Sequence, residues 1–139
     1  MTLAAECPIR THDPLHANRV SRVVIDSAMR VHPVLGPGLL ESAYEACLAW
    51  EIRKSGLLVE TQVPLPLIYE DVHLDVGYRL DVLVDRCLIV ELKAVDGIAP
   101  VHEAQLLSRM KLSGIRLGLL INFNVAHLKE GIRRLVNNF

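Results

Sequence analysis

Three ionisable side chains stand within two runs of apolar residues that are typical of β-strands. Asp81 lies in the first run, and Glu91 and Lys93 lie in the second. Alternate residues of a strand share a face, so Glu91 and Lys93 are expected to point the same way. Carboxylates inside strands of valine, leucine and isoleucine are costly unless a partner balances their charge. The pattern therefore predicts a charged site on a strand pair.

The segment between the two runs, residues 85–87, reads as a hairpin turn. If it is a three-residue turn, Val84 pairs with Leu88 and Asp81 lies opposite Glu91. Directly opposed side chains have Cβ atoms about 4.5–5.5 Å apart, and two carboxylates so placed repel unless a cation lies between them. Mg²⁺ and Mn²⁺ prefer oxygen ligands of this kind and keep waters that a phosphate can displace.

Lys93 would then lie beside a metal-bound water. Its charge could lower the pKa of that water or stabilise charge on a phosphate. The spacing also permits a plainer interpretation, in which Glu91 and Lys93 form a solvated ion pair worth about 0–1 kcal/mol and Asp81 faces solvent. Both interpretations stay open at this point.

The elements that must position these residues follow from periodicity and from proline and glycine. Apolar residues recur at helical spacing in four segments, 18–32, 39–55, 101–113 and 125–137. Asn18 is the expected cap of the first helix, and His32-Pro33 is expected to end or disturb it. Strands are predicted at 58–63, 65–70, 77–84, 88–94 and 115–123.

This order predicts an α/β fold. The strand–helix–strand segment 88–122 implies a parallel pair joined by a right-handed crossover. The length of 139 residues fits one domain. We expect a loose leader over 1–17 and a single domain over 18–139.

Composition excludes several classes of protein. The cysteines are Cys7, Cys47 and Cys87 without a CxxC pair, which argues against a disulfide framework or a structural zinc site. No signal peptide or apolar run of membrane-spanning length is evident, so the expected location is the cytoplasm. The net charge of −1 argues mildly against a tight nucleic-acid-binding module, and the 51% hydrophobic content suggests a possible self-association surface.

Several motifs carry a resemblance to a known family. GYRLD (77–81) followed by VELKAV (90–95) resembles the signature of the PD-(D/E)XK nuclease superfamily. GPGLLESAYE (36–45) resembles the motif of the bacterial and archaeal GxxExxY proteins, with its Gly, Glu and Tyr at Gly38, Glu41 and Tyr44. Further matches are QVPLPL (62–67), HEAQLL (102–107) and GLLINF (118–123). The resemblance covers about residues 20–138.

The resemblance implies a restriction-endonuclease-like αβββαβ core, with a mixed sheet flanked by helices. It implies that Asp81, Glu91 and the backbone carbonyl of Leu92 ligate Mg²⁺ or Mn²⁺, and that Lys93 is catalytic. Glu41 would be an additional metal-binding acid with a catalytic part. The alternative for Glu41 is an exposed acid favoured by the helix dipole.

The resemblance also implies that Gln105 orients the lysine or the substrate, whereas its alternative is a plain surface position. Relatives often have a tyrosine two positions after HEAQLL, where this chain has Arg109. With Lys93, a basic set of Arg109, Lys111 and Arg116 could contact a nucleic-acid backbone, whereas the alternative for each is a place on a solvated face.

Two function hypotheses follow. The first is a divalent-metal-dependent nuclease that hydrolyses phosphodiester bonds of DNA or RNA, alone or only within a complex. The second is a non-catalytic nucleic-acid-binding or assembly module on the same fold. Both hypotheses are compatible with a homodimer or a partner protein, which would hide apolar surface.

Overall fold

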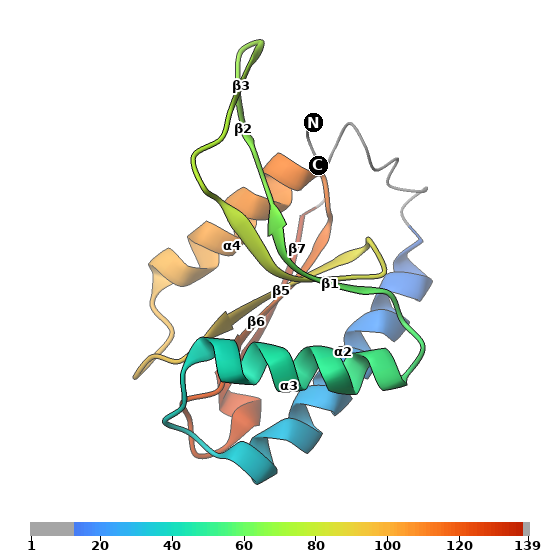
Figure 1. The fold of residues 1–139 in the computed structure, drawn as a ribbon, viewed down its shortest axis with the longest axis vertical. Coiled ribbons are helices and arrows are strands. Elements are labelled where there is room, and N and C mark those ends of the chain that lie inside the picture. The colour runs from blue at the N-terminus through green and yellow to red at the C-terminus, as the bar shows by residue number, and fades with distance from the viewer. Residues whose placement is uncertain (1–12, 138–139) are drawn as a thin grey trace.

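Within residues 13–137, two helices precede the strands and a third lies among them. A computed structural model describes residues 13–137, so most of the expected leader lies outside the described residues. The helices are α2 (Pro14–Leu35), α3 (Glu41–Lys54) and α4 (Pro100–Ser113) (Figure 1). The strands, with the short 3-10 helix η1 (Leu128–Gly131), are β1 (Val59–Pro64), β2 (Leu67–Tyr69), β3 (Val72–Leu74), β4 (Arg79–Val84), β5 (Leu88–Lys93), β6 (Leu117–Asn122) and β7 (Ile132–Val136).

Five strands form one mixed sheet in the order β1-β4-β5-β6-β7. Only β5 and β6 run parallel, in a register that begins with Leu88 opposite Leu117 and ends with Lys93 opposite Asn122. The predicted parallel pair is confirmed, and so is the pairing of Val84 with Leu88 across the turn. The α/β fold expected from the sequence is therefore the observed one.

Helices cover both faces of the sheet (Figure 1). On one face, α2 and α3 pack on a core that includes Val82, Val90 and Leu92. On the other face, α4 packs on a core that includes Ile89 and Leu120. Strand alternation separates these two sets, and it sends Glu91 and Lys93 to the α4 face with Ile89. No helix within residues 13–137 is long and apolar enough to cross a membrane.

The last predicted helix, over 125–137, is wrong. The chain instead forms η1 and then β7, which pairs antiparallel with β6. Leu128, Ile132 and Leu135 recur at helical spacing, but Ile132 and Leu135 pack on opposite faces of the sheet. An unpaired edge of the buried strand β6 would leave backbone hydrogen-bonding groups unsatisfied, and β7 provides their partners.

The first helix starts earlier than predicted. Asp13, not Asn18, is its cap: the Asp13 carboxylate accepts hydrogen bonds from the backbone N–H groups of Leu15 and His16. Pro14 occupies the first turn, where its missing N–H costs nothing. The helix also continues past Pro33 to Leu35.

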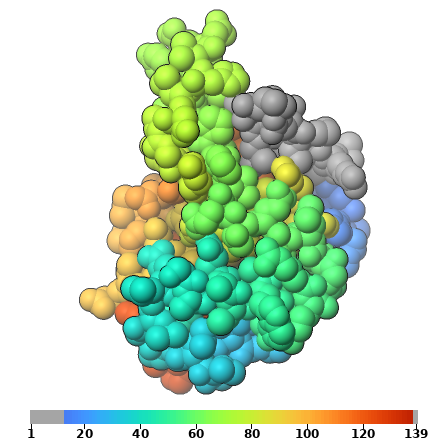
Figure 2. All heavy atoms as spheres, viewed as in Figure 1, coloured from blue at the N-terminus to red at the C-terminus, as the bar shows by residue number. Residues whose placement is uncertain are grey.

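The predicted strand at 65–70 is observed as β2, and with β3, a strand that was not predicted, it forms a short hairpin. It stands clear of the body of the molecule, and Figure 2 shows it as a projection above the helices. The chain thus inserts this hairpin between β1 and β4, two neighbouring strands of the main sheet.

Candidate active site

The β4–β5 ladder ends at the point where the carboxylates stand. Its last pair is Val82 with Val90, and continuing that register by one residue places Asp81 opposite Glu91. Beyond the ladder, the Asp81 Oδ2 atom accepts a hydrogen bond of 2.8 Å from the backbone N–H of Leu92. A side chain therefore takes the place of a backbone acceptor there, and it fixes one carboxylate beside the other strand.

A distortion in the neighbouring strand β1 lies next to this position. The β1–β4 register pairs Thr61 with Val82 and Val63 with Leu80, and it leaves out Gln62, which would face Asp81. Gln62 has a φ of 51°, in the left-handed region that is uncommon for residues other than glycine. Such strained positions gather at functional sites. No feature of the sequence indicated this distortion at Gln62.

Glu91 is a buried carboxylate, with only 4% of its surface exposed. Its Oε1 atom lies 2.9 Å from Arg109 Nη1, whereas its Oε2 atom lies 3.9 Å from Lys93 Nζ, too far for a hydrogen bond. Burial raises the pKa of Glu91, while the charges of Arg109 and Lys93 lower it and those of Asp81 and Glu41 raise it. The Oε2 atom is buried and has no hydrogen-bond partner.

Glu41 is the first residue of α3 and is exposed. Its charge contributes to the raised pKa of Glu91. The start of α3 is fixed by Tyr44, whose hydroxyl donates to the Gly36 carbonyl at 2.6 Å and accepts from the Leu39 N–H at 3.1 Å. The sequence identified Tyr44 only as a residue of the GxxExxY-like motif, and this positioning role was missed.

Asn122 is a second positioning residue that the sequence analysis missed. It ends the buried strand β6, beside Lys93. Its side chain accepts from the Val95 N–H at 3.1 Å and donates to the Val95 carbonyl at 2.9 Å. These bonds hold the chain just after Lys93. An asparagine at the end of the apolar run GLLINF was the available signal.

The other predicted site residues differ in where they lie. Gln105 and Lys111 are exposed on α4. Arg109 turns inward to Glu91. Arg116 precedes Leu117, which pairs with Leu88, so it lies six residues, roughly 20 Å, from the level of Lys93 along the sheet. The structure therefore does not gather the predicted basic set around Lys93.

His102 caps α4: its Nδ1 atom accepts a hydrogen bond of 2.9 Å from the Ala99 N–H. This contact gives His102 a structural role at the start of the helix that follows β5.

The carboxylates fit a divalent ion in their chemistry. Within residues 13–137, no three His, Cys, Asp or Glu side chains converge closely enough to hold a metal. Two carboxylates nevertheless come from neighbouring strands, and one of them has a buried oxygen without a hydrogen-bond partner. Such a pair suits a hard cation that completes its coordination shell with water and backbone oxygens.

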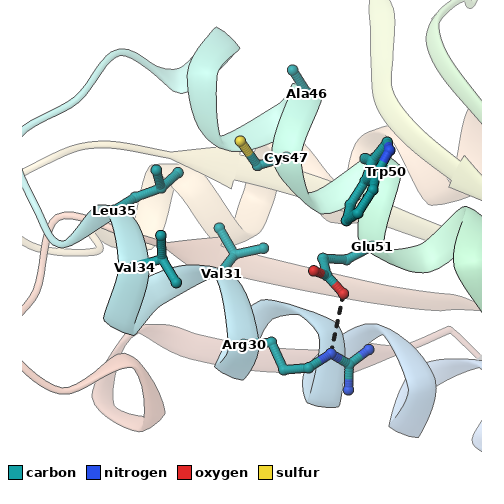
Figure 3. A pocket seen from close by; sticks show the side chains of 8 residues that line it. All are labelled: Arg30, Val31, Val34, Leu35, Ala46, Cys47, Trp50 and Glu51. Carbon is teal, nitrogen blue, oxygen red and sulfur yellow. Dashed lines mark hydrogen bonds and ion pairs between the residues drawn. The ribbon is translucent and has the colours of Figure 1, made fainter.

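A separate hollow lies between α2 and α3 and has a volume of about 400 Å³. Figure 3 shows its mostly apolar walls and the ion pair of Arg30 with Glu51, 3.1 Å long, at one side. It contains none of the predicted site residues; it is lined by Arg30, Val31, Val34, Leu35, Ala46, Cys47, Trp50 and Glu51. The candidate site is therefore the carboxylate cluster and not this hollow.

The fold and site define an α/β protein with acidic residues and a lysine on the central hairpin of a mixed sheet. The family model of the PD-(D/E)XK nuclease superfamily matches residues 18–135, and the chain belongs to that superfamily. Comparison with curated proteins and with solved structures gave no significant match.

Proposed function

We propose that this chain is a divalent-metal-dependent nuclease that hydrolyses phosphodiester bonds of DNA or RNA. The observation that carries the proposal is the Oε2 atom of Glu91, which is buried and lacks a hydrogen-bond partner beside a second carboxylate, Asp81. A buried unpaired carboxylate oxygen is costly unless a ligand completes it. Membership of the nuclease superfamily agrees with this interpretation.

In this proposal Asp81, Glu91 and the Leu92 carbonyl would hold Mg²⁺ or Mn²⁺, with Glu41 assisting. The ion would supply charge neutralisation at the phosphate and a more acidic bound water. Lys93 has a side chain only 20% exposed, and it points its ammonium group into the site. It would orient the attacking water and stabilise the charge that develops on the phosphate.

The remaining assignments concern the substrate. Gln105, from its place on α4, would orient Lys93 or the substrate. Arg109 and Lys111 would contact phosphates near the site, and Arg116 would contact only a longer nucleic acid. We further propose membership of the GxxExxY proteins, a cytoplasmic location, and a homodimer or a partner protein that enlarges the binding surface.

The first prediction tests the nuclease activity through Lys93. Replacing Lys93 with alanine removes the ammonium group next to Glu91, and we expect the cleavage rate to fall by about 10² or more. The measurement is cleavage of single- and double-stranded DNA and RNA in Mg²⁺ or Mn²⁺. Lys129→Ala is the matched control, because it removes an exposed lysine on η1 outside the site.

Equal cleavage by wild type and Lys93→Ala would contradict the assignment of Lys93. If wild type cuts none of the four substrates with either ion, the nuclease proposal itself is contradicted. Thermal unfolding of each variant shows whether a lost activity reflects a lost fold.

A non-catalytic assembly module is the second candidate. It is favoured by the β2–β3 hairpin, on which the paired residues Tyr69 and Val72 share a face and are 64% and 52% exposed. An apolar face of this kind suits contact with another protein. Failure of the intact chain to bind Mn²⁺ at millimolar concentration in isothermal titration would favour this candidate over the nuclease.

A further inference from the structure

Arg109 is the closest cation to the buried carboxylate of Glu91. Its Nη1 atom lies 2.9 Å from Glu91 Oε1, while Lys93 Nζ remains 3.9 Å from the other oxygen. The helix that carries Arg109 packs tightly on the sheet, because a Cβ added to Gly118 would meet Met110 Sδ at 2.7 Å. This close packing of α4 brings the guanidinium within reach of the strand β5.

The ion pair is incomplete on both sides. Glu91 Oε2 and Arg109 Nε are both buried and without a hydrogen-bond partner. A guanidinium and a carboxylate that serve only to stabilise a fold commonly form two parallel hydrogen bonds, which satisfy both groups. The contact between Arg109 and Glu91 thus leaves one buried atom of each group, costly to keep unpaired, available to another partner.

This inference rests on the function proposed above. We propose that Arg109 is the resident counter-ion of Glu91 in the metal-free protein and that it leaves Glu91 when the divalent ion binds. A divalent ion on Glu91 would lie within a few ångströms of the guanidinium. The two positive charges would repel strongly there, because a buried site contains little water to screen them. Arg109 and the metal therefore compete for one carboxylate.

The structure also offers a place for the displaced side chain. Arg109 Cζ lies 5.8 Å from the ring centroid of Tyr78, a side chain that is exposed beside β4. The guanidinium can move outward over this ring and keep its cation–π contact. From there it faces the solvent side of the site, where a guanidinium would bind a phosphate oxygen pair. Metal binding would thus convert Arg109 from a carboxylate partner to a substrate contact.

The test is the affinity of the protein for Mn²⁺, measured by isothermal titration without substrate. We expect Arg109→Gln to bind Mn²⁺ about tenfold more tightly than wild type, because the competing charge is gone. Lys129→Gln is the matched control: it removes one positive charge from an exposed position on η1, outside the site. We expect its affinity to remain within about twofold of wild type.

Equal or weaker Mn²⁺ binding by Arg109→Gln, with wild type binding normally, would overturn the inference and leave the metal site standing. Absence of Mn²⁺ binding in every variant would overturn the proposed function and this inference together. A crystal structure of wild type with Mn²⁺ provides a readout that needs no variant. It should show Arg109 Nη1 more than 4 Å from Glu91 Oε1, and an intact ion pair beside a bound ion would overturn the inference.

Discussion

The function proposed for this protein depends on individual charged side chains of β4 and β5. Asp81, Glu91 and Lys93 were recognisable from the sequence because alternation along a strand is a local property. The partner of Glu91 was not recognisable. Arg109 is 18 positions further along the chain, and only the packing of α4 decides that it points at the carboxylate rather than at solvent.

The turn between β4 and β5 contains Cys87, and burial makes its thiol less acidic. Desolvation raises the pKa of Cys87 from the ordinary value of 9.0 to about 11, and the nearby charge of Asp85 adds to the rise. The folded protein therefore holds this proton longer than the unfolded chain does. Between pH 9 and about 11, Cys87 makes the free energy of unfolding fall as pH rises.

We predict slow alkylation of Cys87 in the folded protein. With Cys7 and Cys47 replaced by serine, the rate with iodoacetamide at pH 8 should be roughly 100-fold below that of the same chain in urea, because only the thiolate reacts. The folded-state rate should continue to rise above pH 9. A rate that levels off near pH 9 in the folded state would contradict the raised pKa.

At the scale of elements, the C-terminal segment is held against the sheet by a close approach of two backbones. η1 and β7 return along β6, and Gly131 stands where they meet. A Cβ added to Gly131 would lie 2.3 Å from the Asn122 carbonyl oxygen, a backbone atom that cannot move aside cheaply. The same Asn122 holds the chain after Lys93, so this contact connects the sheet edge with the site.

Replacing Gly131 with alanine is therefore expected to lower the free energy of unfolding by about 1–3 kcal/mol, because the methyl group overpacks the contact. Urea unfolding measures the change. Gly97→Ala is the matched control, since a Cβ there meets nothing within 4 Å. Equal stability of the two variants would show that the η1–β6 contact is looser than the structure indicates.

The elements also differ in how far their sequences predict them. The helices α3 and α4 and the strands β4, β5 and β6 are evident from periodicity and from their bounding glycine and proline residues. The strand β7 is not, because Leu128, Ile132 and Leu135 satisfy a helical pattern and a strand equally well. The unpaired edge of β6, a feature of the assembled sheet, decides between the two.

For the molecule as a whole, the net charge of −1 constrains how it can hold a nucleic acid. A binding surface made of many lysines and arginines would show a steep dependence on salt, since each neutralised phosphate releases counter-ions. The structure places Arg109 at the site and Arg116 at the far end of β6. At the proposed site, a bound metal ion would therefore supply much of the attraction to phosphate.

We predict that nucleic-acid binding depends on the divalent ion. For Lys93→Ala, used so that substrate is not cut, Mg²⁺ should tighten binding at least about tenfold relative to EDTA. In EDTA the logarithm of affinity should fall with the logarithm of salt with a slope of only about −2 to −3, since few phosphates are contacted. Fluorescence anisotropy measures both. Tight binding in EDTA with a slope near −6 would contradict this.

The sequence by itself determined the α/β class, the central hairpin and the shared face of Glu91 and Lys93, because these follow from periodicities of two and 3.6 residues along the chain. The tertiary structure alone decided three further features: the strained Gln62 beside Asp81, the hydroxyl of Tyr44 that fixes the start of α3, and the contact of Arg109 with Glu91. Each of these features depends on which segments, distant along the chain, pack together. The local sequence pattern does not determine that packing.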